Sequence, residues 1–176
     1  ALYERKKRAV LEICKACRDM SDKKIGALII FERNTMLGDI INTGTVVDAK
    51  VSRELINALF FPNSALHDGG VVIRDGRVVA AGCILPLTDN NSLSSELGTR
   101  HRASLGISEK SDAVAVVVSE ETGKISIACG GELERGVSDG ILMERLMDYI
   151  LPDNANKEKK SFFSVLLTNV KEKFKK

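Results

Sequence analysis

The stretch that decides the fold is VVIRDGRVVAAGCIL, residues 71–85. It consists of two runs rich in β-branched residues, joined at Asp75-Gly76. An Asp-Gly pair between two such runs is a strong signal for a tight β-hairpin, because both residues tolerate the backbone that the turn requires. The stretch therefore predicts two antiparallel strands in the middle of the chain.

Similar runs on either side of this hairpin predict a larger sheet. They are GALIIF (26–31), AVAVVVS (113–119) and KISIACG (124–130), the last two flanking the turn residues EETG. The central runs are apolar at nearly every position, which is typical of strands that are buried on both faces. Such a sheet needs helices to cover it.

Helical patterns alternate with the strands. They span residues 3–20, residues 51–60 before Pro62, the segment ELGTRHRASLGIS (96–108), and residues 138–150 before Pro152. The order of elements predicts an α/β (α+β) fold: a single globular domain with a mixed, mostly antiparallel β-sheet surrounded by helices.

Length and composition agree with one domain. The chain has 176 residues, of which 44% are hydrophobic and 28% charged, enough for one well-buried core and too few for two ordinary domains. A net charge of +2 gives no sign of a nucleic-acid-binding surface. Neither a membrane-spanning run nor the apolar part of a signal peptide is present, so we expect the chain as given to be soluble.

The four cysteines do not suggest a metal or redox centre. Cys14 and Cys17 have C-x-x-C spacing, but no second pair of cysteines or histidines lies where a zinc site would need it. Both fall on the apolar stripe of the first predicted helix, which favours core packing. Reduced thiols are expected, as in a cytosolic protein.

The last 25 residues differ sharply in composition, so we separate a domain at 1–151 from a tail at 152–176. The tail has seven lysines and three acidic residues, a net charge of +4. Its apolar residues at helical spacing are Phe163, Leu166, Leu167, Val170 and Phe174. Two interpretations stay open: a disordered terminus, or a basic amphipathic helix that lies on an anionic membrane surface or docks a partner helix.

Arg100, His101 and Arg102 concentrate cationic donors in three positions. Such a group suits an anion with many oxygens, such as phosphate, although a solvated basic helix face is the ordinary alternative. In the middle of a helix, Arg100 and Arg102 would point about 200° apart. They converge only at a helix start, where Thr99 would be the N-cap and free N–H groups attract anions.

Two acidic segments are candidates for the other half of a site. In LHDGG (66–70), Asp68 precedes two glycines at the start of a strand, with His67 beside it, so that a carboxylate can approach a ligand or metal with little obstruction. Ser119-Glu120-Glu121 lies at a strand end. Each segment also fits an ordinary turn.

Together, these segments supply a carboxylate, a phosphate clamp and a second carboxylate. That is the minimum set for metal-assisted phosphoryl or nucleotidyl transfer. The patterns G-x-x-x-x-G-K-[ST] and G-x-G-x-x-G are both absent, so the common nucleotide-binding folds are disfavoured.

A run of segments over residues 2–150 resembles the diadenylate cyclases, which make cyclic di-AMP from two ATP molecules. The segments are IGALII, LGDIINTGTVVDAKVS, FPNSALHDGGVVI, AAGCILPLT, ELGTRHRASLGISEKSDAVAVVVSEETG and ISIACGGEL, in that order. D-G-G at 68–70 and R-H-R at 100–102 match the two signature motifs. The chain is similar to the membrane-linked branch with a single cyclase domain, so we expect a fragment from the cytoplasmic side of the membrane, without the preceding transmembrane helices.

The resemblance implies a role for each matching position. Asp68 would activate the 3′-hydroxyl of ATP, and the triphosphate would be held by the basic cluster. The implied catalytic residues are Asp68, Gly69, Arg100, His101 and Arg102. The implied substrate-binding residues are Gly70, Gly82, Leu85, Thr99, Ser119 and Glu120, with backbone groups from Gly82 to Leu85 reading the adenine. The implied ligands of Mg²⁺ or Mn²⁺ are Asp68, His67 and Glu121.

Two positions depart from the family pattern. Gly70 replaces a frequent alanine, which is a minor change, and Ile84 stands where related chains often have an aromatic residue. Ile84 removes a stacking surface, so base recognition would depend on backbone hydrogen bonds and apolar contact.

The implied reaction also predicts an assembly. One small domain offers one ATP site, whereas closing the ring needs two sites that face each other, so we expect a transient homodimer. A regulatory protein partner is also expected. The alternative functions are a non-catalytic module that senses ATP or cyclic di-AMP through a partner, and a metal-dependent phosphodiesterase. Asp68 argues against a pure sensor, and two histidines are few for a phosphodiesterase metal cluster.

Overall fold

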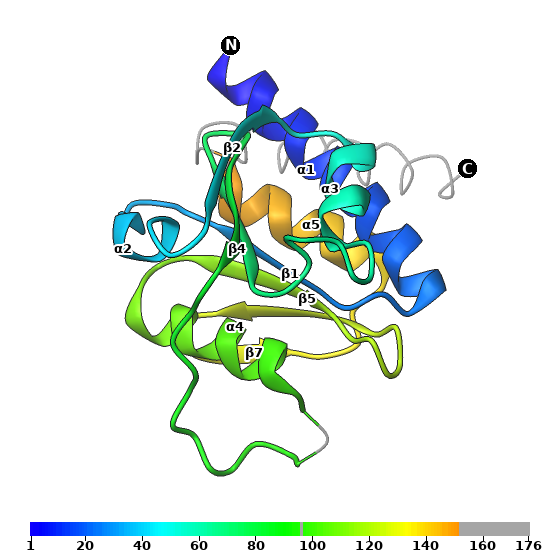
Figure 1. The fold of residues 1–176 in the computed structure, drawn as a ribbon, viewed down its shortest axis with the longest axis vertical. Helices are drawn as coiled ribbons and strands as arrows, with labels where there is room; N and C mark the ends of the chain where they lie inside the picture. The colour runs from blue at the N-terminus through cyan, green and yellow to red at the C-terminus, as the bar shows by residue number, and fades with distance from the viewer. Residues whose placement is uncertain (96, 152–176) are drawn as a thin grey trace, which may run out of the picture.

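The computed structural model describes residues 1–95 and 97–151. The tail at 152–176, with both interpretations of it, lies outside these residues. Within them, one seven-stranded sheet has the order β2-β4-β3-β1-β5-β6-β7 (Figure 1). The strands are β1 (Ala27–Phe31), β2 (Thr45–Lys50), β3 (Gly70–Arg74), β4 (Arg77–Cys83), β5 (Val114–Val118), β6 (Ile125–Cys129) and β7 (Glu132–Glu134).

The sheet is mixed and mostly antiparallel, as predicted. β1 pairs in parallel with β3, with Ile29 opposite Val71, and every other neighbouring pair is antiparallel. The predicted hairpin joins β3 to β4. Asp75 and Gly76 both have positive φ, 49° and 74°, which is the backbone of a two-residue turn that matches the twist of the strands.

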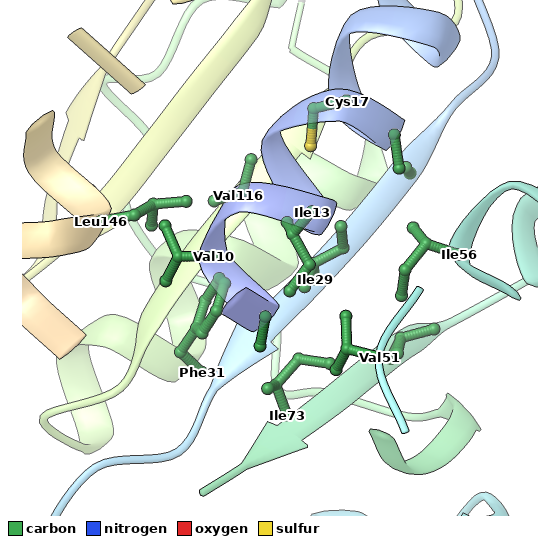
Figure 2. Packing of buried hydrophobic residues seen from close by; sticks show 14 of the residues in the cluster. Val10, Ile13, Cys17, Ile29, Phe31, Val51, Ile56, Ile73, Val116 and Leu146 are labelled. Atoms are coloured by element: carbon green, nitrogen blue, oxygen red, sulfur yellow. The ribbon is translucent and has the colours of Figure 1, made fainter. Parts of the chain in front are cut away.

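Helices cover both faces of the sheet. As a consequence, every residue of the central strands β1 and β5 is buried. The helices are α1 (Leu2–Lys23), α2 (Gly38–Ile41), α3 (Arg53–Phe60), α4 (Thr99–Lys110) and α5 (Asp139–Ile150). α1, α3 and α5 pack on one face. Figure 2 shows Val10, Ile13 and Cys17 of α1 over Ile29 and Val116 of the sheet. α2 and α4 contribute to a second apolar cluster on the other face.

All four predicted helices are present, and two of them begin with a serine whose side chain caps the helix. The Ser52 side chain accepts a hydrogen bond from the backbone N–H of Leu55, and the Ser138 side chain accepts one from Ile141. The helix predicted from residue 51 therefore begins two residues later.

Three elements were not predicted: α2, β2 and β7. β2 is an edge strand that has mostly exposed or half-buried residues, and its pairing with β4 is irregular between Val46 and Ala49. α2 has four residues and β7 has three. Short or exposed elements carry no hydrophobic period that could reveal them.

The cysteines of α1 pack as predicted. Cys17 is fully buried and Cys14 is half-buried against the same cluster. Burial raises the pKa of Cys14 to about 12, so its thiol is protonated and unreactive at neutral pH. The four cysteines all lie within the described residues, and none of them is in a disulfide. Among residues 1–95 and 97–151, no helix is long and apolar enough to span a bilayer.

Candidate functional site

A cleft of about 800 Å³ lies at one edge of the sheet. Because β1 and β3 are parallel and β4 and β5 run against them, the amino ends of β1 and β3 meet the carboxyl ends of β4 and β5 at this edge. Residues that line the cleft come from all four of these strand ends and from the start of α4. The topology thus brings together the predicted segments around Asp68, Leu85, Arg100 and Glu120.

Asp68 and His67 form one side of the cleft. The Asp68 side chain is 88% exposed, so its carboxylate is open to a ligand. Nδ1 of His67 lies 2.7 Å from the carbonyl oxygen of Ser64, which can only accept, so Nδ1 carries a proton. In the neutral ring, Nε2 therefore presents a lone pair 3.5 Å from Oδ1 of Asp68. Two electron-pair donors at this separation suit a bound cation or a shared proton.

The two glycines after Asp68 serve packing against the sheet. Gly69 has φ +86°, and a Cβ there would lie 2.5 Å from the carbonyl oxygen of Cys83. A Cβ at Gly70 would lie 2.5 Å from Ile30 and 2.8 Å from Leu85. Gly69 lines the cleft and Gly70 does not. The space beside Gly70 is therefore filled by other side chains of the protein. Together, Gly69 and Gly70 let the loop that carries Asp68 lie close to β4.

The start of α4 forms the opposite side. The N-cap of α4 is Gly98, with no side-chain hydrogen bond, and Thr99 is the first helical residue. The expectation that Thr99 is the N-cap was wrong, because its backbone is already helical. Thr99 nevertheless lines the cleft. Because Thr99 lies in the first turn, its backbone N–H has no hydrogen-bond partner within the helix.

Arg100 is the basic side chain that lines the cleft. It also borders a smaller hollow of about 100 Å³, which His101, Ser119, Glu120 and Glu121 line as well. Its Nη1 lies 3.4 Å from Oε2 of Glu120, and its side chain is 22% exposed. Nε of Arg100 is buried and has no hydrogen-bond partner, a condition shared among the described residues only with Oδ1 of Asn57.

The other two residues of the basic cluster are placed differently. Arg102 is half-buried in α4 and lines neither the cleft nor the hollow. His101 is buried and borders only the hollow. Burial, and next the nearby charges of Arg135 and Arg100, lower the pKa of His101, against an opposing effect of Glu121. The imidazole is therefore neutral at pH 7, so of the three residues only Arg100 presents a full positive charge to the cleft.

Ser119, Glu120 and Glu121 form the turn after β5. The Ser119 hydroxyl oxygen accepts hydrogen bonds from the backbone N–H groups of Glu121 and Thr122, each at 3.2 Å. Within the described part of the chain, no three His, Cys, Asp or Glu side chains gather as a metal-binding group. The structure therefore does not bring His67, Asp68 and Glu121 together as one ligand set.

The end of β4 supplies an apolar wall. Leu85 is buried and lines the cleft, whereas Ile84 is 69% exposed at its mouth. The backbone N–H of Ile84 donates to Oγ1 of Thr43 at 2.8 Å, so it is not free to read a base. Gly82 does not line the cleft; it has φ +65° and packs beneath the loop that carries Leu66 and Asp68.

Several residues of the cleft were missed by the sequence analysis. They are Ile25, Gly26, Leu28, Phe60, Pro62, Asn63, Leu87 and Ala103. Each lies in or beside a strand or helix end, where its residue type is ordinary. Nothing in their local sequence distinguishes them from core or turn positions.

Comparison with known proteins identifies relatives of this chain. Over 143 residues it is 46% identical to the cyclic di-AMP synthase CdaA of Bacillus subtilis, covering 81% of this chain and 52% of that protein. Over 155 residues it is 46% identical to a diadenylate cyclase of Listeria monocytogenes, covering 88% of this chain and 57% of that protein. The chain thus spans little more than half the length of these relatives.

Solved structures have the same fold. The crystal structure of a double mutant of DacA from Staphylococcus aureus superposes with a TM-score of 0.81 at 45% identity, covering 82% of this chain and 97% of that one. The crystal structure of a protein from Bacillus cereus, described as a hypothetical membrane spanning protein, gives a TM-score of 0.70 at 45% identity, covering 73% and 63%. Residues 14–133 match the DAC family, described as the DisA bacterial checkpoint controller nucleotide-binding domain. With two thirds of its residues in that match and relatives at 46% identity, the chain belongs to the DAC family.

Proposed function

We propose that this chain is the catalytic domain of a diadenylate cyclase, which condenses two ATP molecules into cyclic di-AMP and releases two pyrophosphates. The observation that carries the proposal is the pairing, across one cleft, of an exposed carboxylate at Asp68 with a partly buried guanidinium at Arg100. The names of the relatives, cyclic di-AMP synthase and diadenylate cyclase, support the choice of substrate.

Arg100 and Thr99 are suited to the triphosphate. Leaving the buried Nε of Arg100 without a hydrogen-bond partner destabilises the free protein by about 1–3 kcal/mol. Such an unsatisfied group is expected where a ligand supplies the missing acceptor. Phosphate oxygens accept from a guanidinium and from the free N–H groups of a helix start. Ser119 has a hydroxyl proton available for the same purpose. Because Arg102 lines neither hollow, the proposal assigns the triphosphate contact to Arg100 and not to Arg102, whose implied role rests on the family pattern alone.

Asp68 is suited to the reacting hydroxyl. In the proposed step, the 3′-oxygen of one ATP forms a bond to the α-phosphorus of the other, and the bond from that phosphorus to the pyrophosphate oxygen breaks. The proton of the hydroxyl passes to the Asp68 carboxylate. Arg100 offsets the negative charge that grows on the departing pyrophosphate.

A divalent cation fits this site through few protein ligands. Mg²⁺ is commonly bound by one or two carboxylates together with substrate phosphates, and Asp68 would supply such a carboxylate. Nε2 of His67, 3.5 Å from Oδ1 of Asp68, would add a nitrogen ligand, which suits transition metals better than Mg²⁺. Glu121 would need to contribute from the neighbouring hollow. A bound Mg²⁺ or Mn²⁺ supplies charge neutralisation and lowers the pKa of a coordinated hydroxyl.

The apolar wall is suited to the adenine. Leu28, Leu85 and Leu87 line the cleft without a charged group among them, as expected of a surface that accepts a planar base. At the mouth, Ile84 is 69% exposed and Leu87 is 48% exposed. These side chains would be covered when two copies face each other to join their two ATP molecules, which supports a transient homodimer.

The whole protein is proposed to act at the cytoplasmic face of a membrane and to be regulated by a protein partner. The description of the Bacillus cereus relative as membrane spanning supports this location. The net charge of +2 gives no support for nucleic acid as a partner.

Incubation of the chain with ATP and Mn²⁺ or Mg²⁺, followed by chromatography, tests the proposal. We expect cyclic di-AMP and pyrophosphate in a ratio of one to two, and neither product from an Asp68→Asn variant. Binding of ATP or cyclic di-AMP without turnover under either metal would favour the sensing module. Breakdown of cyclic di-AMP in place of its synthesis would favour the phosphodiesterase.

A further inference from the structure

Gly26 lies directly beneath the Arg100 guanidinium, at the residue before β1. It is buried, and a Cβ at this position would lie 2.4 Å from Nη1, 2.7 Å from Cζ and 3.2 Å from Nε of Arg100. All three of the nearest atoms belong to that one side chain. The guanidinium thus occupies the space that any larger residue at position 26 would fill.

The backbone does not account for a glycine here. Gly26 is not among the residues with positive φ, so an L-residue could adopt its conformation without backbone strain. By contrast, Gly69 needs glycine for its φ of +86° as well as for space. At position 26 the closest steric conflict is with Arg100.

The guanidinium also has a charged neighbour. Glu120, from the turn after β5, lies 3.4 Å from Nη1 of Arg100, which is also the atom nearest to the Cβ position of Gly26. Because the conflicting atoms are the far end of a long side chain, a methyl group at position 26 would displace the guanidinium more readily than it would displace the strand.

We propose that Gly26 is a positioning residue of the triphosphate site, which fixes the place of the Arg100 guanidinium by having no side chain. The inference rests on the proposed function, in which Arg100 binds the triphosphate. Gly26 has no side chain to offer a ligand, so the proposal assigns its effect on nucleotide binding to the position of Arg100.

A double-mutant cycle tests this dependence, with 3′-deoxy-ATP as a probe that cannot cyclise and AMP as a ligand without β- and γ-phosphates. Gly26→Ala should weaken 3′-deoxy-ATP binding about ten-fold and AMP binding less than about two-fold. In an Arg100→Ala background, Gly26→Ala should change 3′-deoxy-ATP affinity less than about two-fold, because the group that it displaces is gone. Isothermal titration calorimetry measures the affinity of each nucleotide for the four proteins of the cycle.

Gly140→Ala is the matched control, since a Cβ at Gly140 in α5 meets nothing within 4 Å, and it should leave both affinities unchanged. Equal weakening by Gly26→Ala with and without Arg100 would overturn the proposal, as would equal weakening of both nucleotides. If Gly26→Ala fails to fold, restoration of the fold by Arg100→Ala supports the steric coupling, and continued unfolding overturns it. An Arg100→Ala variant with normal 3′-deoxy-ATP affinity would instead refute the triphosphate role of Arg100 in the proposed function.

Discussion

Replacement of Arg100 by alanine should weaken ATP binding while leaving the fold as stable as before. Charge-assisted hydrogen bonds to a phosphate contribute about 1.5–3 kcal/mol, so the dissociation constant should rise about 10- to 150-fold. The cost to the free protein is small, because the pair with Glu120 is exposed on the Glu120 side, at 67%, and such pairs contribute at most about 1 kcal/mol. Removal of the unpartnered, buried Nε offsets that loss.

Arg102→Ala is the matched control, because it removes the same charge two residues further along α4, from a side chain that lines neither hollow. Its effect on ATP affinity should stay within about three-fold, as expected of a screened charge without direct contact. Calorimetric titration with 3′-deoxy-ATP and with AMP, together with thermal unfolding, measures both variants. Equal losses of ATP and AMP affinity in Arg100→Ala would refute the reasoning, and so would equal losses of ATP affinity in the two variants.

Other variants test the remaining parts of the site and the fold. Asp68→Asn should abolish cyclic di-AMP formation and keep ATP affinity within a few-fold, since the amide cannot accept the hydroxyl proton; near-normal turnover would remove Asp68 from the reaction. Glu120→Gln should tighten ATP binding about two- to five-fold by freeing Arg100 from a competing carboxylate, and a weaker complex would contradict that view. Specific activity should rise with protein concentration at fixed ATP, because two copies must meet, and a flat dilution series into the monomeric range would exclude the dimer requirement. Arg53, through its hydrogen bonds, lowers the pKa of Asp19 to about 2, so the pair stabilises the fold above the ordinary pKa of about 3.8 and loses this effect as the pH falls through 2; Arg53→Ala should lower the melting temperature less at pH 2 than at pH 7.

The fold was predictable where local signals agree with burial. The sequence predicts the Asp75-Gly76 turn and the strands on either side of it, because a strand buried on both faces must be apolar at successive positions. β2 escaped prediction for the opposite reason, since its exposed residues and its irregular pairing leave no alternation. The family resemblance added the mechanism, which composition and spacing alone did not supply.

The candidate site was predictable where its chemistry is concentrated in sequence. Arg100 stands out within a basic triplet and Asp68 before two glycines, whereas Gly26 looks like any glycine that precedes a strand. Only the packing distance to the Arg100 guanidinium distinguishes it. Helical spacing indicated that Arg100 and Arg102 diverge within a helix, but the sequence did not show which of them faces the cleft, because that depends on how α4 packs.

The single parallel pair in the sheet explains why these segments meet. With β1 parallel to β3, the residues before both strands, Gly26 and Asp68, lie at one edge. β5 and β4 run against them and bring Glu120 and Leu85 to that same edge. If β1 ran antiparallel to β3, Gly26 would lie at the far end of a five-residue strand, about 16 Å away. The Arg100 guanidinium could not then rest on it, so the crossover from β1 to β3 through α2, β2 and α3 is what assembles the cleft.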